Sequence, residues 1–170
     1  MPFPWRPGMR ITAGRLEEHT PRWISKSETE ERTSTTSLTP DSELQVELDP
    51  GVWDVHMWLS VAGTDGSGGV RTVWGLDSGM SLIGFKMVQG PAAPSTNRVE
   101  TLMRTGVHSA GAAPVYGARQ DASTFAAVEE WAVVQVSSTG ILALEWAQQT
   151  LSTDGAWVGI GSFIRADRIG

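Results

Sequence analysis

The fold class is decided by the stretch Leu44-Gln45-Val46-Glu47-Leu48-Asp49-Pro50-Gly51-Val52-Trp53-Asp54-Val55-His56-Met57-Trp58-Leu59-Ser60-Val61. Apolar residues take every second position on both sides of the Pro-Gly turn signal, and this period is that of β-strands with one face in a core. After the turn, one face carries Trp53, Val55, Met57, Leu59 and Val61. Trp58 lies on the opposite, polar face, so we expect a neighbouring loop or subunit to cover it.

Similar segments, rich in β-branched and aromatic residues, follow one another along the rest of the chain and are separated by turn residues. Roughly eight to ten short strands at this spacing predict an all-β protein, an antiparallel β-sandwich rather than a parallel α/β sheet. Periodicity alone does not separate a jelly roll from an immunoglobulin-like topology. Outside residues 44–61, the expected strands cover residues 23–26, 32–38, 70–76, 81–88, 97–107, 129–136, 140–147 and 157–169.

Three details of these strands are also predicted. The glycine-rich connection at 63–69 indicates a hairpin between the strands on either side of it. Residues 125–128 suit a helix as well as a strand, and we place the strand from about Glu129. Glycines interrupt the last expected strand and indicate a bulge or a close backbone approach, which would fit a symmetry axis. The oligomer-interface candidates are therefore Trp157, Gly159, Gly161 and Phe163.

Residues 1–20 differ in composition from the β-rich remainder and predict an N-terminal arm on a sandwich domain at residues 21–170. Thr12 can cap a short helix from Ala13 to His19, which Pro21 would end. An isolated segment of this length would leave its large apolar side chains poorly covered, so we expect them to dock on another protein or on the chain's own domain. The docking candidates are Trp5, Met9, Ile11 and Leu16.

The composition limits the classes of partner that the chain is expected to bind. A net charge of −6 and a pI near 5.0 argue against nucleic acid, because binding a phosphate backbone needs a concentrated basic surface. The chain shows no apolar run long enough for a signal peptide or a membrane span, so we expect a soluble product made in the cytoplasm, without a membrane partner. The chain has no cysteine, which excludes disulfides and thiol chemistry.

No pattern of catalytic or metal-binding residues stands out. The serines lack the flanking glycines of a nucleophile elbow. Asp54 and His56 share a strand face but offer only two ligands, and a solvated pair is the better interpretation. Glu129 and Glu130 would point to opposite faces of a strand, unlike a glycosidase pair. We therefore expect a protein that is not an enzyme, with no metal and no cofactor.

Both ends of the chain resemble known structural proteins. The segment Trp5-Arg6-Pro7-Gly8-Met9-Arg10-Ile11-Thr12-Ala13-Gly14-Arg15-Leu16 is similar to the opening of small structural proteins of tailed bacteriophages that infect actinobacteria. Gly140-Ile141-Leu142-Ala143-Leu144-Glu145-Trp146-Ala147-Gln148 and Gly161-Ser162-Phe163-Ile164-Arg165-Ala166 resemble the last two strands of virion fibre and decoration domains with a tumour-necrosis-factor-like jelly roll. The middle of the chain matches these proteins only in style.

The resemblance implies a virion component of the minor tail, fibre or capsid-decoration type, trimeric through its β-domain and attached to the tail or capsid by its arm. Two alternatives stay open. A carbohydrate-binding, lectin-like module for host surface glycans would use aromatic platforms, for which the candidates are Trp58, Trp74 and Tyr116. A hydrolase with a site assembled across subunits would depend on Glu129 or Glu145.

Overall fold

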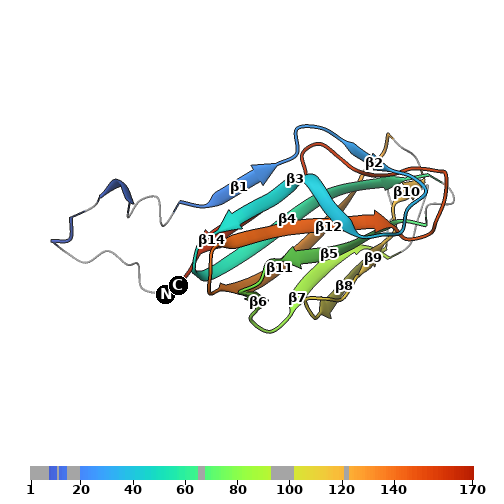
Figure 1. Ribbon diagram of the computed structural model, residues 1–170. Helices are drawn as coiled ribbons and strands as arrows, with labels where there is room; N and C mark the ends of the chain where they lie inside the picture. Colours follow the sequence, from blue (N-terminus) through green and yellow to red (C-terminus); the bar gives the residue numbers. More distant parts are fainter. Residues whose placement is uncertain (1–7, 11, 15–19, 65–67, 93–101, 121–122) are drawn as a thin grey trace.

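The computed structural model describes residues 8–170 except 11, 15–19, 65–67, 93–101 and 121–122. These residues form one ten-stranded and one four-stranded β-sheet, which pack face to face (Figure 1). The strand pairs are antiparallel, apart from a short parallel pairing of β10 with β4. The prediction of an all-β, sandwich-like protein is confirmed.

The larger sheet has the path β1-β14-β4-β11-β7-β8, and four short strands pair with it off this path. Its strands are β1 (Arg22–Ser25), β2 (Glu30–Arg32), β4 (Gly51–Gly63), β6 (Met80–Leu82), β7 (Lys86–Pro91), β8 (Met103–His108), β10 (Arg119–Gln120), β11 (Ala126–Val136), β13 (Ala156–Val158) and β14 (Phe163–Arg168).

The smaller sheet has the order β3-β12-β5-β9. Its strands are β3 (Thr39–Leu48), β5 (Val70–Leu76), β9 (Val115–Tyr116) and β12 (Gly140–Gln148).

The strand pairs are nested in sequence. β7 pairs with β8, β5 with β9, β4 with β11, β3 with β12 and β1 with β14, so each pair encloses the one before it. Successive pairs alternate between the two sheets. The described chain therefore has the connectivity of one long hairpin rolled into two layers.

The core lies between the sheets and follows the period-two pattern. On β4 the predicted inner residues are all buried, as are the alternate residues of β11. Leu44, Val46 and Leu48 of β3 cover them from the smaller sheet. The Pro50-Gly51 turn joins β3 to β4, and it carries the chain from the smaller sheet to the larger one.

Four strand predictions are wrong in detail. The strand expected at residues 81–88 is two strands, β6 and β7, which both pair with β11 and are separated by residues 83–85. β4 and β5 belong to different sheets, so the connection at 63–69 joins two layers instead of closing a hairpin. Residues 34–38 form a loop between β2 and β3. The last expected strand is two strands, β13 and β14, which follow the same edge of β4 and are separated by a turn at Ile160–Gly161. Residues 126–128, left open between helix and strand, belong to β11.

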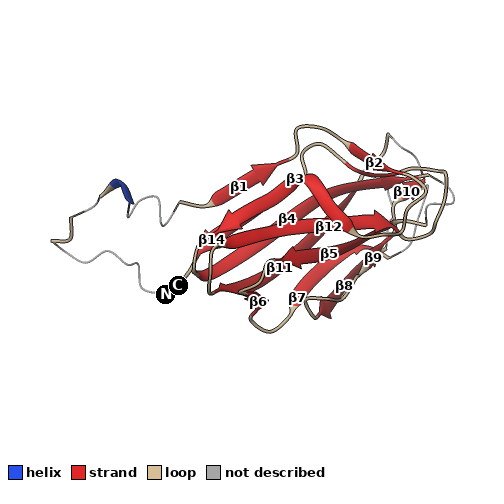
Figure 2. Cartoon of the chain, viewed as in Figure 1, coloured by secondary structure: helices blue, strands red, loops and turns tan. Residues whose placement is uncertain are grey.

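Little of the N-terminal arm belongs to the described residues. Ala13 and Gly14 have helical conformation (Figure 2), but 15–19 lie outside the description, so the expected helix is not shown. Among the residues that the structure describes, no helix is long and apolar enough to cross a membrane.

A buried carboxylate, Glu130 of β11, ties the two sheets together. It accepts hydrogen bonds from the indole N–H of Trp74 at 2.6 Å, the phenol of Tyr116 at 2.7 Å and the hydroxyl of Thr72, all from the smaller sheet. Lys86 of β7 completes the set with an ion pair at 2.9 Å, and neither side chain of this pair is exposed. Burial and the adjacent carboxylate raise the pKa of Tyr116, which keeps the phenol a donor.

The other lysine of the chain forms a similar buried ion pair, at the end of β1. Lys26, which follows β1, pairs with Asp41 of β3 at 2.8 Å, and both side chains are fully buried. Asp41 also accepts the indole N–H of Trp146 at 3.0 Å and the backbone N–H of Leu44 at 3.0 Å. Glu30 and Glu43 lie 3.5 Å from the ammonium. Both lysines of the chain are therefore used inside the sandwich.

Candidate functional site

The outward face of the larger sheet is the candidate functional site. The strand register aligns one residue from each of six strands in a single row across this face. In order from β1 to β8, the row is Trp23, Arg165, His56, Trp131, Met87 and Val107. Three members are large apolar or aromatic residues more than 40% exposed, although such residues prefer the core.

One end of the row is aromatic. Trp23, which is 54% exposed, stacks on Phe163 with ring centroids 4.3 Å apart and planes 18° from parallel. The ring of His56 meets Phe163 edge-on at 6.4 Å. We call Trp23 and Phe163 the β1–β14 patch, a stacked aromatic pair in which more than half of Trp23 is exposed.

The other end of the row is also apolar. Phe85 precedes β7 and is 64% exposed, Met87 pairs directly with Val107, and Val107 on the outermost strand β8 is 66% exposed. We call these three residues the β7–β8 patch. Because β8 is the last strand of the sheet path, the patch lies at an edge of the sandwich.

A shallow pocket of about 380 Å³ lies between the two patches. The indole N–H of Trp131 donates to Asp54, and Arg165 bridges Asp167 at 2.8 Å. Carboxylates, a guanidinium, an amide and an indole face converge here, a combination that can bind a polar ligand with several hydrogen-bonding groups. Its lining residues are Asp54, His56, Met87, Gln89, Glu129, Trp131, Arg165 and Asp167.

The aromatic residues predicted to stack on glycans lie in two different places. Trp58 is half-buried on the outward face, where its cross-strand neighbours are Phe163 and Glu129. Trp74 and Tyr116 are 3% and 2% exposed, and their polar atoms are bound to Glu130. These two rings belong to the core and present no face to a ligand.

The glycine-rich interface candidates are placed around the turn between β13 and β14. Gly159 packs against the chain's own Phe125, whose ring lies 2.5 Å from where a Cβ would stand. Gly161 has φ +87°, a conformation that favours glycine, and it forms the turn. Trp157 is half-buried on β13. Of this group, only Phe163 contacts the row, through its stacking on Trp23.

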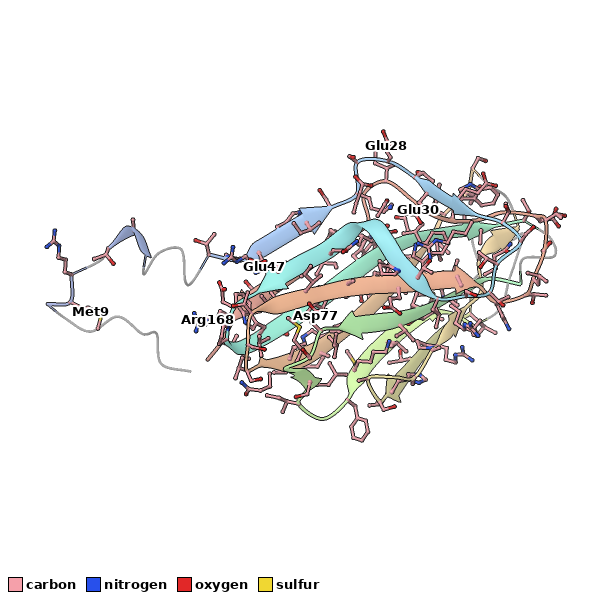
Figure 3. The ribbon with its side chains drawn as sticks, viewed as in Figure 1. Met9, Glu28, Glu30, Glu47, Asp77 and Arg168 are labelled. Atoms are coloured by element: carbon pink, nitrogen blue, oxygen red, sulfur yellow. The ribbon has the colours of Figure 1, made fainter. Side chains whose placement is uncertain are left out.

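The docking candidates of the arm lie mostly outside the described residues. Trp5, Ile11 and Leu16 are not described, and Met9 is half-buried. Figure 3 labels Met9 at the far end of the arm, away from the sandwich.

Asp54 and His56, the pair weighed as two possible metal ligands, are not joined by a third ligand within the described residues. Asp54 and His56 both line the pocket, but no group of three or more His, Asp or Glu side chains within the described residues is arranged to hold a metal ion. Glu129 lines the pocket while Glu130 is buried, so the two point to opposite faces as expected.

Sequence reasoning missed most of the outward face. Trp23, Trp131, Met87 and Val107 were not singled out, because each strand supplies one of them and only the register joins them. One signal was available: Trp131 alternates with the apolar Ala132 and Val134, which places a tryptophan on the outward face. Comparisons with protein-family models, curated proteins and solved structures find no match for the chain.

Proposed function

We propose that this chain is a non-enzymatic structural protein of a tailed-phage virion, which assembles as a homotrimer through its β-domain and attaches to the tail or capsid by its N-terminal arm. The observation that carries the proposal is the nested pairing of strands in two sheets. Nested pairs that alternate between layers support a jelly roll, an architecture that recurs in viral capsid and lectin domains. The resemblance of both chain ends to virion proteins supports the same class.

Self-association is supported by the outward face of the larger sheet. Exposed apolar patches with polar surroundings mark interaction sites. Trp23, Met87 and Val107 are exposed within one row of this face. Aromatic residues, methionine and arginine are the residues enriched at interface cores.

The experiment that tests the proposal is light scattering at micromolar concentration on the full chain and on a shortened chain that starts at Thr20. Both the full chain and the shortened chain are expected to be trimers, which would leave the arm free to act as an anchor. If the full chain is a monomer, the proposed homotrimer is wrong. A trimer of the full chain beside a monomer of the shortened chain would show that the arm, not the β-domain, holds the copies together.

A second candidate, glycan binding, is favoured by one observation, the polar pocket that Trp131 lines. A sugar ring could lie against the indole while the surrounding carboxylates and Gln89 accept or donate hydrogen bonds. An array of cell-wall saccharides tests it, with Trp131→Ala as the variant that must lose binding. Ile160→Ala is the matched control, because it also truncates an exposed apolar side chain but lies on the turn after β13.

A further inference from the structure

We propose that the pocket on the outward face of the larger sheet binds an amino sugar whose amine is free and protonated. The ammonium group contacts Glu129, and the sugar ring lies against the indole of Trp131. This inference rests on glycan binding, the second function proposed above, and adds which class of sugar the pocket selects; it does not depend on the trimer. It is carried by a carboxylate that has no partner among the described residues and that lies beside an exposed indole.

The charges of the pocket give the first step of the argument. The lining has three carboxylates and one guanidinium, which belong to Asp54, Glu129, Asp167 and Arg165. Arg165 already bridges Asp167, at 2.8 Å and 3.1 Å. With His56 neutral, three negative charges and one positive charge leave the described lining with a surplus of two negative charges. The pocket therefore attracts a cation and repels an anionic ligand.

The three carboxylates differ in what already contacts them. Asp167 is paired with Arg165, and Asp54 accepts the indole N–H of Trp131. Within the described part of the chain, no hydrogen bond or ion pair reaches the carboxylate of Glu129, which is half-buried on β11. Covering such a group with a ligand costs free energy unless the ligand supplies donors to it. Glu129 is therefore the carboxylate at which a ligand gains most from carrying a donor.

The neighbours of Glu129 favour an ammonium group as that donor. Trp58 on β4 and Gln89 on β7 lie directly across from Glu129. Trp131 lies two residues further along β11, on the same face of the sheet. Tryptophan is the side chain whose ring face attracts cations most strongly. An ammonium group at Glu129 thus meets a carboxylate, one indole across the sheet and another along the strand.

The rest of the pocket favours a sugar over an alkylamine. Trp131 is 40% exposed, and its indole offers an apolar surface to the C–H face of a sugar ring. The side chains of Gln89 and His56 form no hydrogen bond among the described residues, so both can bind the hydroxyl groups of a ligand. An alkylamine has no hydroxyl group for either of them. The volume of about 380 Å³ lies within the range of small-molecule sites.

The same arrangement predicts which sugars are rejected. N-acetylation removes the charge of the amine, so an acetylated sugar offers Glu129 only a neutral amide donor. A plain sugar offers only a hydroxyl group. Hydrogen bonds between two charged groups are shorter and stronger than those of neutral donors. The pocket should therefore prefer the free amine to both of these sugars.

Isothermal titration calorimetry on the full chain tests this preference with four probes, in a buffer in which the amine is protonated. The probes are a glucosamine trisaccharide, the same trisaccharide fully N-acetylated, the glucose trisaccharide of the same linkage, and the alkyl diamine cadaverine. We expect the glucosamine trisaccharide to bind at least tenfold more tightly than each of the other three.

Two matched variants locate the binding. Glu129→Gln should weaken binding of the glucosamine trisaccharide at least tenfold, because the ammonium loses its charged acceptor. Glu47→Gln removes the same charge from an exposed position on β3 of the smaller sheet, outside the pocket, and should leave the dissociation constant unchanged. Circular dichroism of both variants checks that the sandwich stays folded.

The outcomes separate this inference from the functions proposed above. Equal affinities for the three trisaccharides leave glycan binding in place and overturn the selection of an amine. Cadaverine that binds as tightly as the amino sugar overturns the choice of a sugar. Equal losses in Glu129→Gln and Glu47→Gln show attraction by net charge alone and overturn the site. If no probe binds, this inference and glycan binding are both wrong, whereas the proposed trimer is unaffected.

Discussion

At the scale of single residues, Glu129 and Glu130 show how one step along a strand changes the role of a carboxylate. Glu130 is fully buried and receives four donors, whereas Glu129 lines the open pocket. Replacing Glu130 leaves the ammonium of Lys86 buried without its counter-ion, and breaking a buried pair costs about 3–5 kcal/mol. We therefore expect Glu130→Gln to lower the free energy of unfolding by that amount, measured by urea titration.

The neighbouring glutamate supplies the control for this prediction. Glu129→Gln makes the same chemical change on the outward face and should shift the free energy of unfolding by no more than about 0.5 kcal/mol. Equal effects of the two substitutions would show that the buried pair contributes nothing particular to stability.

Glu43 predicts a dependence of stability on pH. Hydrogen bonds from the side chain and backbone of Ser27 lower the pKa of Glu43 to about 2, from an ordinary value of 4.5. A carboxyl with a lowered folded-state pKa stabilises the protein fully above its unfolded pKa and loses this contribution as pH falls. The loss should therefore occur between about pH 4.5 and pH 2.

The variant Glu43→Gln isolates that contribution. Thermal unfolding midpoints of the native chain and the variant should differ at pH 7 and converge as the pH approaches 2. Glu30 has a lowered pKa as well, because hydrogen bonds from Arg32 and Ser42 outweigh the effect of burial, so the native chain keeps a residual pH dependence in the variant. Parallel curves over the whole pH range would contradict the prediction for Glu43.

At the scale of elements, one glycine fixes how β5 begins. Gly69 has φ +119°, and an added Cβ would lie 2.2 Å from the backbone carbonyl oxygen of Tyr116 in β9. Gly84 also has positive φ, at +84°, but an added Cβ meets nothing within 4 Å. Gly84→Ala should cost roughly 1–2 kcal/mol for the backbone conformation alone.

The difference between these two substitutions reports the contact between β5 and β9. Gly69→Ala carries a backbone cost of at least this size, because φ +119° lies further from the left-handed helical region, and it adds a clash that only a shift of the strands can relieve. We expect it to destabilise the protein by at least about 1 kcal/mol more than Gly84→Ala in chemical denaturation. Equal costs would mean that the β5–β9 pairing gives way easily.

The elements also show what the sequence could predict. Strict alternation identified the strands around Leu44–Val61, because each has one buried face. The same alternation cannot say to which sheet a strand belongs, so β4 and β5 were wrongly joined in a hairpin. Near Phe125, helical and extended patterns overlap, and the long pairing of β11 with β4 decides in favour of the strand.

At the scale of the whole molecule, the candidate site could not be predicted because no segment contains it. Its row takes one residue from each of six strands, so the face exists only once the register is set. The tryptophans predicted as platforms divide by strand parity and by sheet: Trp58 lies on the outward face and Trp74 points into the core. Aromatic content indicates an interface, but only topology locates it.

The two buried lysines provide a test of whether the sandwich unfolds as one unit. Lys26 follows β1 and Lys86 begins β7, so they lie near opposite ends of the larger sheet path, and both side chains are fully buried. An amine-reactive ester should therefore leave both unmodified in the native protein and react with them only after unfolding. Mass spectrometry of peptides after timed labelling in increasing urea measures each site separately. Equal rates are expected for a cooperative sandwich, whereas faster labelling of Lys86 would show that the β7–β8 edge opens by itself.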